Sequence, residues 1–337
     1  MPSPERTALI ESFLAGAGWA GATRRLLAAD ASFRHYDRVT RGRERAVLMD
    51  APPPRENVQA FLEVARQLLD LGLSAPRPLR ADEAAGLLLL EDLGDRTFTR
   101  ALAEGAEEAA LYRLAIDVLI ALHRSWRAED HAGLPPYDDE KLLAEAALLT
   151  DWFLPAVRSG EETDPGAREA YLAAWQAVLP AARRVPETLV LRDYHVDNLM
   201  LLEGREGVSA CGLLDFQDAV VGSCAYDVVS LLEDARRDIR PKLVEAMLSR
   251  YLDAFPGLDR AAFAESYAVL GAQRAAKIIG IFTRLDRRDG KPHYLRHIPR
   301  IWRLLEAGLE TPVLAPVKAW FTHEVPRAER IEPETLS

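Results

Sequence analysis

The chain has 337 residues, 49% of them hydrophobic, and a formal net charge of −10, which allows two lobes or two modest domains around a real core. The negative charge argues against a nucleic-acid or anionic-membrane surface, because both depend on clustered lysine and arginine. The two cysteines, Cys211 and Cys224, form no disulfide framework or metal-ligand spacing, and short apolar runs without a signal pattern predict a cytoplasmic protein with no membrane span.

The first 94 residues combine helical and strand-like patterns. Apolar residues at helical spacing predict one helix over residues 4–17 and another over residues 56–71. Short runs bounded by turn residues predict strands at residues 23–28, 33–40, 45–50, 79–81 and 87–90.

Beyond Gly94 the pattern becomes mainly helical. Helices are expected at residues 97–103, 107–127, 138–159, 166–183, 224–236, 240–255, 259–287 and 292–309. Residues 325–337 look like a tail.

The chain is organised around residues 188–227. Asp193 follows an apolar run of strand length, Asn198 stands five residues later, and Asp215 follows another such run after a turn. Phosphoryl transfer needs a carboxylate to receive or orient the proton of a hydroxyl, and oxygen ligands to hold Mg²⁺ against the phosphates of ATP. Asp193 is therefore the candidate base, and Asn198 and Asp215 are the candidate metal ligands.

This combination resembles the eukaryotic-like kinases, and it is most similar to the aminoglycoside phosphotransferase and choline kinase family. That family often carries a second histidine two residues after the catalytic aspartate, as His195 does here. The resemblance implies an ATP- and Mg²⁺-dependent enzyme with an α+β, two-lobed protein-kinase-like fold. Its small mixed-sheet N-lobe would cover residues 1–94, and a mainly helical C-lobe would cover residues 95–324.

The resemblance also implies a hinge between the lobes. The order of three strands, a helix and two strands in the first 94 residues is that of a kinase small lobe. The last of these strands runs into Glu91, Asp92 and Leu93. In the family, the backbone groups of such a segment pair with adenine.

The sequence departs from the kinase pattern at the phosphate-binding elements. Kinases cover the phosphates with a glycine-rich tip and hold them with a lysine on the third strand. Here the tip has no glycine, Met49 stands where that lysine would fall, and no lysine precedes position 141. A cation from this side must be arginine, so Arg34 and Arg38 are candidates, although either could lie on a solvated outer face. Ser32 could donate to phosphate or be an ordinary turn residue.

Three residues around the candidate base have alternative roles. Arg192 could orient Asp193, or it could pair with an acidic neighbour such as Asp227, and the second, fold-holding role is favoured. Asp227 would then steady the catalytic loop. His195 could contact the substrate or brace the loop through a backbone hydrogen bond.

Several local phrases resemble one subgroup, the anomeric kinases of cell-wall recycling. They include DASFRHY from residue 30, LLLEDLG from residue 88 and DFQDA from residue 215, within a resemblance that spans about residues 5 to 310. These kinases transfer the γ-phosphate of ATP to the 1-hydroxyl of N-acetylmuramate and N-acetylglucosamine. An anomeric hydroxyl is more acidic than an ordinary alcohol, so a carboxylate that mainly positions it can suffice.

A sugar site needs several polar side chains around an apolar or aromatic wall. Glu145 is one candidate for binding the substrate. Arg274, Lys277 and Arg284 are spaced three and seven residues apart, so they share one helix face that could meet a lactyl carboxylate. The same pattern also fits a solvated basic stripe.

Two classes of alternative remain open. One is an aminoglycoside-, choline- or homoserine-type kinase, although aromatic residues are only 7% and do not cluster as a choline cage requires. The other is a catalytically silent kinase-like protein that binds nucleotide or sugar as a regulator. We expect a small-molecule substrate, no nucleic-acid partner, and a monomer or dimer.

Overall fold

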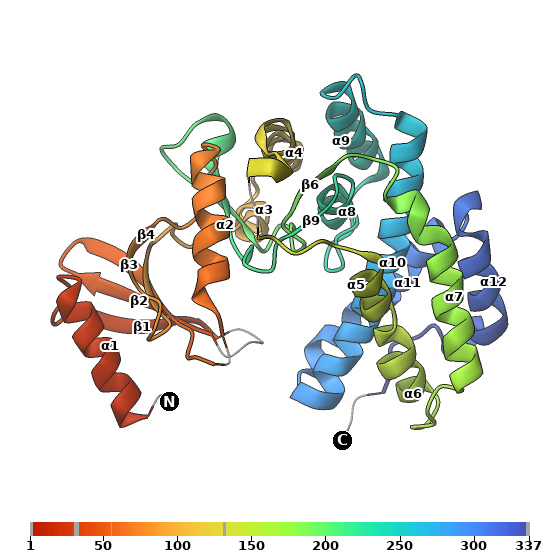
Figure 1. Ribbon diagram of the computed structural model, residues 1–337, viewed down its shortest axis with the longest axis horizontal. Coiled ribbons are helices and arrows are strands. Elements are labelled where there is room, and N and C mark those ends of the chain that lie inside the picture. The colour runs from red at the N-terminus through yellow and green to blue at the C-terminus, as the bar shows by residue number, and fades with distance from the viewer. Residues whose placement is uncertain (1–2, 30–33, 55, 131–132, 335–337) are drawn as a thin grey trace. The chain divides into compact units, whose positions relative to one another are not determined.

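The computed structural model describes residues 3–29, 34–54, 56–130 and 133–334. By its internal contacts the chain forms two compact units, residues 1–125 with 196–219, and residues 126–195 with 220–337 (Figure 1). In the described part of the chain, every helix is too short or too polar to span a lipid bilayer.

The first unit is built on a five-stranded sheet. The strands follow the order β1-β2-β3-β5-β4, and every neighbouring pair is antiparallel. The prediction of a mixed sheet was therefore wrong. The bounds of the strands are β1 (Thr23–Ala29), β2 (His35–Arg41), β3 (Glu44–Asp50), β4 (Pro78–Asp82) and β5 (Leu87–Glu91). All five predicted strands are therefore confirmed, with ends shifted by one or two residues.

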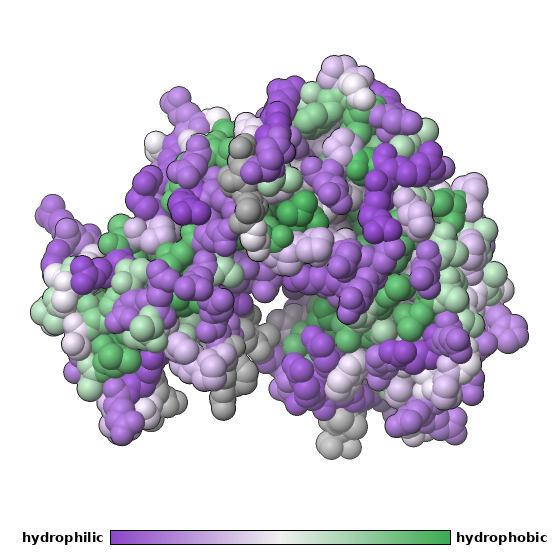
Figure 2. All heavy atoms as spheres, in the orientation of Figure 1, coloured by the Kyte–Doolittle hydropathy of each residue, from purple (hydrophilic) through white to green (hydrophobic). Residues whose placement is uncertain are grey.

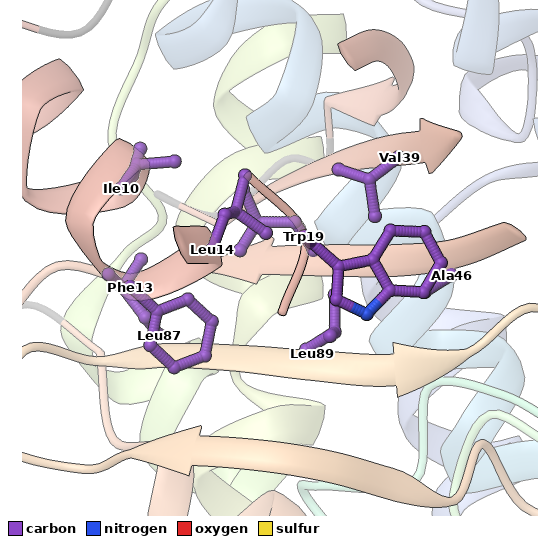
Figure 3. Packing of buried hydrophobic residues seen from close by; sticks show 9 residues of the cluster. Ile10, Phe13, Leu14, Trp19, Val39, Ala46, Leu87 and Leu89 are labelled. Atoms are coloured by element: carbon purple, nitrogen blue, oxygen red, sulfur yellow. The ribbon is translucent and has the colours of Figure 1, made fainter. Parts of the chain in front are cut away.

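Helix α1 (Pro4–Gly16) covers one face of this sheet. Ser3 caps its N-terminus, and Ile10, Phe13 and Leu14 form its buried side. Figure 3 shows these three side chains with Trp19 against residues of β2, β3 and β5. Burying this apolar cluster fixes the helix to the sheet. The sheet residues of the cluster are Val39, Ala46, Leu48, Leu87 and Leu89.

Helix α2 (Val58–Asp70) begins at Asn57, whose side chain caps the amide of Gln59. Its apolar stripe includes Phe61, which packs on Phe216 with ring centroids 4.9 Å apart. This contact links α2 to the segment that begins after strand β8 (Cys211–Leu213). The unit is completed by α3 (Phe98–Ala103), α4 (Glu108–Ser125) and the antiparallel hairpin β7 (Leu199–Leu201) and β8 (Cys211–Leu213).

The second unit is mainly helical and contains one antiparallel strand pair, β6 (Glu187–Val190) with β9 (Val220–Ser223). Its longest helix is α10 (Arg260–Asp289), which begins at the cap Asp259 and ends at Gly290, whose φ of 63° suits glycine. The remaining helices are α5 (Asp139–Ala146), the π-helix η2 (Leu149–Phe153), α6 (Leu154–Val157), α7 (Pro165–Ala182), α8 (Tyr226–Leu232), α9 (Pro241–Asp253), α11 (Ile298–Gly308) and α12 (Ala315–Glu324).

The two units do not end at residue 94, where a lobe boundary was expected. Helices α3 and α4 and the β7–β8 hairpin belong to the unit that contains the sheet. The lobe boundary stays a prediction, because a division of the chain by its internal contacts does not identify the two lobes of a kinase. In the segment expected to be a tail, Val325 is buried and Arg330 pairs with Glu306 at 2.7 Å, so residues 325–330 are anchored.

Polar and charged side chains dominate the face of the molecule in Figure 2. The exposed large apolar residues among those described come from several elements: Leu9, Leu26, Leu27, Leu79 and Ile331.

Candidate active site

The first unit contains a cavity of about 440 Å³. Apolar side chains such as Leu27, Val47 and Met200 form much of its wall, and the segment that follows β5 forms its edge. A cavity with mainly apolar walls and a few polar groups suits a small organic ligand. The polar lining residues include Asn198 and Asp215.

The predicted hinge residues Glu91, Asp92 and Leu93 all line this cavity. Glu91 ends β5, where its amide donates to the Arg77 carbonyl at 2.8 Å. The Asp92 carboxylate accepts from the Gly94 amide at 2.9 Å, which fixes the turn after the strand. The segment is therefore held by its own hydrogen bonds at the edge of the cavity.

Arg38, one of the two candidate phosphate ligands, is bound to the hinge. Its guanidinium lies 2.7 Å from Asp92 and 2.8 Å from Asp95, and it donates to the Gly94 carbonyl at 3.1 Å. These contacts connect β2 to the hinge. A phosphate would have to compete with two carboxylates for Arg38, and the predicted phosphate contact of this residue stays a prediction.

Arg34, the other candidate, is buried and lies near Asp215, one of the two metal-ligand candidates. Its guanidinium is 3.3 Å from Glu56 and 4.0 Å from Asp218. Burial lowers its pKa, but nearby acidic groups, including Glu56 and Asp215, raise that pKa above its usual value. Arg34 is thus a fixed cation close to Asp215, whereas Ser32 lies outside the described residues.

The β7–β8 hairpin brings Asn198 and Asp215 together. The Asn198 amide nitrogen lies 3.4 Å from Oδ2 of Asp215, and the Leu214 amide donates to the Asn198 carbonyl at 3.0 Å. Asp215 has a φ of 58°, a left-handed conformation that is uncommon outside glycine. Gln217 donates to Oδ1 of Asp215 at 2.8 Å and so orients its carboxylate.

These two residues fit Mg²⁺, which takes oxygen ligands and usually keeps several waters and substrate phosphates. The described residues contain no group of three or more His, Cys, Asp and Glu side chains that could hold a metal by themselves. A site with one carboxylate and one amide oxygen suits an ion that arrives with nucleotide.

In the second unit, a strained turn after β6 presents Asp193. Arg192 has a φ of 69°, and the Asp193 amide donates to the Leu191 carbonyl at 2.8 Å. A hydrogen bond from the amide of one residue to the carbonyl two residues earlier, with a positive φ at the residue between them, is the pattern of the rarer and more strained γ-turn. Asp193 is exposed at this turn.

Asp227, at the start of α8, holds the turn from the buried side. Its carboxylate oxygens accept from the amides of Leu191 at 2.6 Å and Arg192 at 3.0 Å. Burial raises the pKa of Asp227 to about 7, although the two amides oppose this rise. Ser230, one helical turn later, donates to the Arg192 carbonyl at 3.2 Å. The geometry supports the predicted role of Asp227 in steadying the loop.

Replacing Asp227 with alanine should lower the free energy of unfolding by about 2–4 kcal/mol, because two buried amides lose their acceptor. Asp227→Asn keeps one acceptor oxygen and should cost less. Urea denaturation of the two variants and the wild type measures the difference. Equal stability of Asp227→Ala and wild type would contradict this account of the turn.

The guanidinium of Arg192 forms an ion pair with Glu145, rather than the expected pair with Asp227, which holds the Arg192 backbone. Glu145 also accepts from Lys277, at 2.9 Å. The Lys277 ammonium lies 3.4 Å from the hydroxyls of both Tyr137 and Tyr226. Burial raises the pKa of Glu145, but the two cations outweigh it and lower that pKa below its usual value.

Glu145 and Lys277 were expected to bind substrate, and the structure places them together in this buried cluster. Removing one charge from such a cluster leaves the others uncompensated, which typically costs about 3–5 kcal/mol. Glu145→Gln should therefore destabilise the protein by about that amount. Adding Lys277→Met to Glu145→Gln should recover part of the loss, as measured by urea denaturation. A double variant that is less stable than Glu145→Gln alone would contradict the charge argument.

The other three substrate-binding candidates lie in different surroundings. His195 is buried, and its Nε2 lies 3.4 Å from an Arg236 nitrogen. Arg274 is also buried, and it lies near Asp227 and Glu233: burial raises the pKa of each carboxyl to about 7, and the charge of Arg274 opposes that rise. Arg284 is half-buried. Arg274 and Lys277 therefore do not form a solvated basic stripe.

Sequence reasoning missed Arg236 and the aromatic group beside it. The Arg236 guanidinium lies 5.7 Å from the centre of the Phe282 ring, and Phe282 packs on Tyr294 at 5.1 Å. Arg236 lies in the local sequence DARRD, from residue 234, which carries no signal of this contact. Its partner is 46 residues away, so no local spacing predicts the pair.

An antiparallel sheet covered by a helix, a cavity at the end of β5 and a mainly helical second unit are the features of a protein-kinase-like phosphotransferase fold. The chain belongs to the phosphotransferase enzyme family, whose model matches residues 23–264.

Two relatives illustrate its place within the family. The N-acetylmuramate/N-acetylglucosamine kinase of Caulobacter vibrioides is 39% identical, over 96% of this chain and 98% of that protein. The protein of the same name from Pseudomonas aeruginosa is 38% identical, over 83% of this chain and 82% of that protein.

Solved structures confirm the predicted fold. A putative aminoglycoside phosphotransferase from Ralstonia eutropha superposes with a TM-score of 0.63 at 14% identity, covering 93% of this chain and 98% of that one. A choline kinase from Streptococcus pneumoniae superposes with a TM-score of 0.61 at 13% identity, covering 90% of this chain and 99% of that one. At such low identity these likenesses establish the fold alone.

Proposed function

We propose that the protein is an ATP- and Mg²⁺-dependent sugar kinase that phosphorylates the anomeric hydroxyl of N-acetylmuramate and N-acetylglucosamine. The observation that carries the proposal is the pairing of Asn198 with Asp215 in the wall of the hinge-edged cavity. The names of the relatives, which match most of this chain, supply the acceptor. The reaction belongs to cell-wall recycling in the cytoplasm, where ATP is present.

On the nucleotide side, the backbone groups of residues 91–93 would pair with adenine at the cavity edge. Asn198 and Asp215 would hold Mg²⁺, which when bound neutralises charge on the phosphate oxygens. Arg34 takes the place of the missing lysine, because it is buried, held by Glu56 and near Asp215. Arg38 supports the site through the hinge.

On the acceptor side, Asp193 would accept a hydrogen bond from the anomeric hydroxyl and take its proton as the new P–O bond forms. The bond between the γ-phosphorus and its bridging oxygen would break in the same transfer, and ADP would leave with that oxygen. The strained turn at Arg192 restricts the orientations available to this carboxylate. Fixing a base in advance lowers the entropic cost of aligning it with the hydroxyl. Asp227, Ser230 and Glu145 keep the turn in place.

The test is ADP release by the purified protein with ATP and Mg²⁺ in parallel reactions containing N-acetylmuramate, N-acetylglucosamine, choline and kanamycin. The proposal predicts acceptor-dependent ADP release with the two sugars only. Release with choline or kanamycin and not with the sugars would retain the kinase and refute the acceptor. Magnesium-dependent stabilisation by ATP, with no release in any reaction, would favour a silent binding protein.

A further inference from the structure

The three substrate-binding candidates on α10 are Arg274, Lys277 and Arg284, and they differ in how their charges are balanced. Arg274 lies near Asp227 and Glu233. Lys277 is paired with Glu145. Arg284 has no ion pair with any described residue.

Arg284 is a cation in unfavourable surroundings. It is half-buried, and its Nε is buried without a hydrogen-bond partner among the described residues. Burial and then the neighbouring charge of Arg288 lower its pKa, and Asp289 only partly offsets them. Asp289 is itself bound by Arg288, at 2.8 Å and 2.9 Å. A guanidinium in such a place gains stability when an anion binds it, because a buried charge is costly until it is paired.

The packing of α10 indicates where Arg284 lies. Helix α5 packs along α10, and contacts between them advance together along both helices. Gln273 donates to the Leu142 carbonyl, and about one turn later Lys277 pairs with Glu145. One turn further, a Cβ at Gly280 would lie 2.3 Å from the backbone of Leu148. The next step places Arg284 beside the π-helix η2 (149–153), on the same helix face as Lys277.

The face of α10 that carries Arg284 also carries Lys277, which contacts a residue that holds the turn of the base. Lys277 shares Glu145 with Arg192, the residue before Asp193. Arg284 follows Lys277 by seven residues, which is about 10 Å along the helix axis. η2 also contributes Trp152, which is half-buried. π-helical turns occur frequently at functional sites.

We propose that Arg284 binds the lactyl carboxylate of N-acetylmuramate and so determines how well this acceptor is used relative to N-acetylglucosamine. The inference rests on the proposed function. A guanidinium binds a carboxylate through two parallel hydrogen bonds, which an ammonium cannot reproduce. N-acetylglucosamine lacks the carboxylate and makes no such contact.

The experiment compares kcat/KM for the two sugars in the wild type, Arg284→Gln, Arg284→Lys and the control Arg288→Gln. Arg288 lies one turn further on the same face, and it is already paired. Arg284→Gln should lower kcat/KM for N-acetylmuramate by about 10- to 100-fold. The same variant should change kcat/KM for N-acetylglucosamine by no more than about two-fold, because this sugar makes no contact with Arg284. Arg284→Lys should recover part of the loss, and Arg288→Gln should change neither sugar.

The melting temperature without ligand separates this role from a structural one. Because Arg284 would lose no hydrogen bond or ion pair with the described part of the chain, Arg284→Gln should melt no lower than the wild type. A clear drop in melting temperature, or an equal loss for both sugars, would overturn the inference. A loss specific to N-acetylmuramate in Arg236→Gln, with none in Arg284→Gln, would overturn it too. Wild-type turnover of N-acetylglucosamine alone would keep the sugar-kinase reaction but refute N-acetylmuramate as an acceptor, and with it the role of Arg284. Turnover of neither sugar would refute both proposals.

Discussion

Replacing Asp193 with asparagine is expected to lower kcat by about 10²- to 10⁴-fold, the usual contribution of a positioned general base. The amide keeps the size and a hydrogen-bond acceptor but cannot take the proton of the hydroxyl. The turn that carries Asp193 is held by backbone and Arg192 contacts, so the variant should fold normally. The KM for ATP should stay close to that of the wild type. Steady-state kinetics with both sugars measures the effect.

Asp197→Asn is the matched control, because it makes the same change four residues later. The Asp197 carboxylate accepts a hydrogen bond from the Thr99 hydroxyl, which asparagine can also do. This control should retain activity within about two-fold, far from the loss expected of a general base. A folded, ATP-binding Asp193→Asn variant that matches it would rule out Asp193 as the base.

The second large effect is expected for Asp215→Asn, which should lower kcat by about 10²- to 10³-fold, like the loss of other groups that stabilise transition-state charge. Asparagine is the suitable replacement because it tolerates the left-handed backbone at this position. The variant keeps one oxygen but loses the charge that attracts the metal. ATP should therefore no longer stabilise it in a magnesium-dependent way, which thermal denaturation with and without Mg²⁺ measures.

Glu206→Gln provides the control for Asp215→Asn. Glu206 is an exposed carboxylate in the turn of the same hairpin, so this change removes an equal charge away from the cavity. Its ATP stabilisation should remain magnesium-dependent. If Asp215→Asn retained the same dependence, Asp215 would not be a metal ligand.

Local patterns predicted most of the fold. The strands of the first unit were visible because short apolar runs lie between turn residues, and the order of these elements matched a kinase small lobe. Asp193 and Asp215 could be selected because each follows a strand-length run, and Asn198 because it stands five residues after Asp193. The direction of strand pairing was missed, because alternation within a strand does not reveal the direction of its neighbour.

The errors concern partners that are distant in sequence and local changes of helix type. Residues 138–159 were predicted as one helix, but the chain forms α5, the π-helix η2 and α6, whose apolar spacing is nearly the same. Strand β9 and helix α12 were not predicted. The choice of Glu145 as the ion-pair partner of Arg192 depends on a contact across 47 residues. The sequence likewise could not show which cations of α10 are paired, because the acidic partner of Lys277 is distant in sequence.

The most direct test of the account is ³¹P NMR of the reaction of the protein with ATP, Mg²⁺ and N-acetylglucosamine, with N-acetylmuramate in a parallel sample. The account predicts a new phosphate resonance coupled to an anomeric proton in both samples, together with conversion of ATP to ADP. A phosphate coupled to any other sugar proton would contradict the proposed position of transfer. No new phosphorylated sugar in either sample, with ATP still bound, would contradict the proposed function itself.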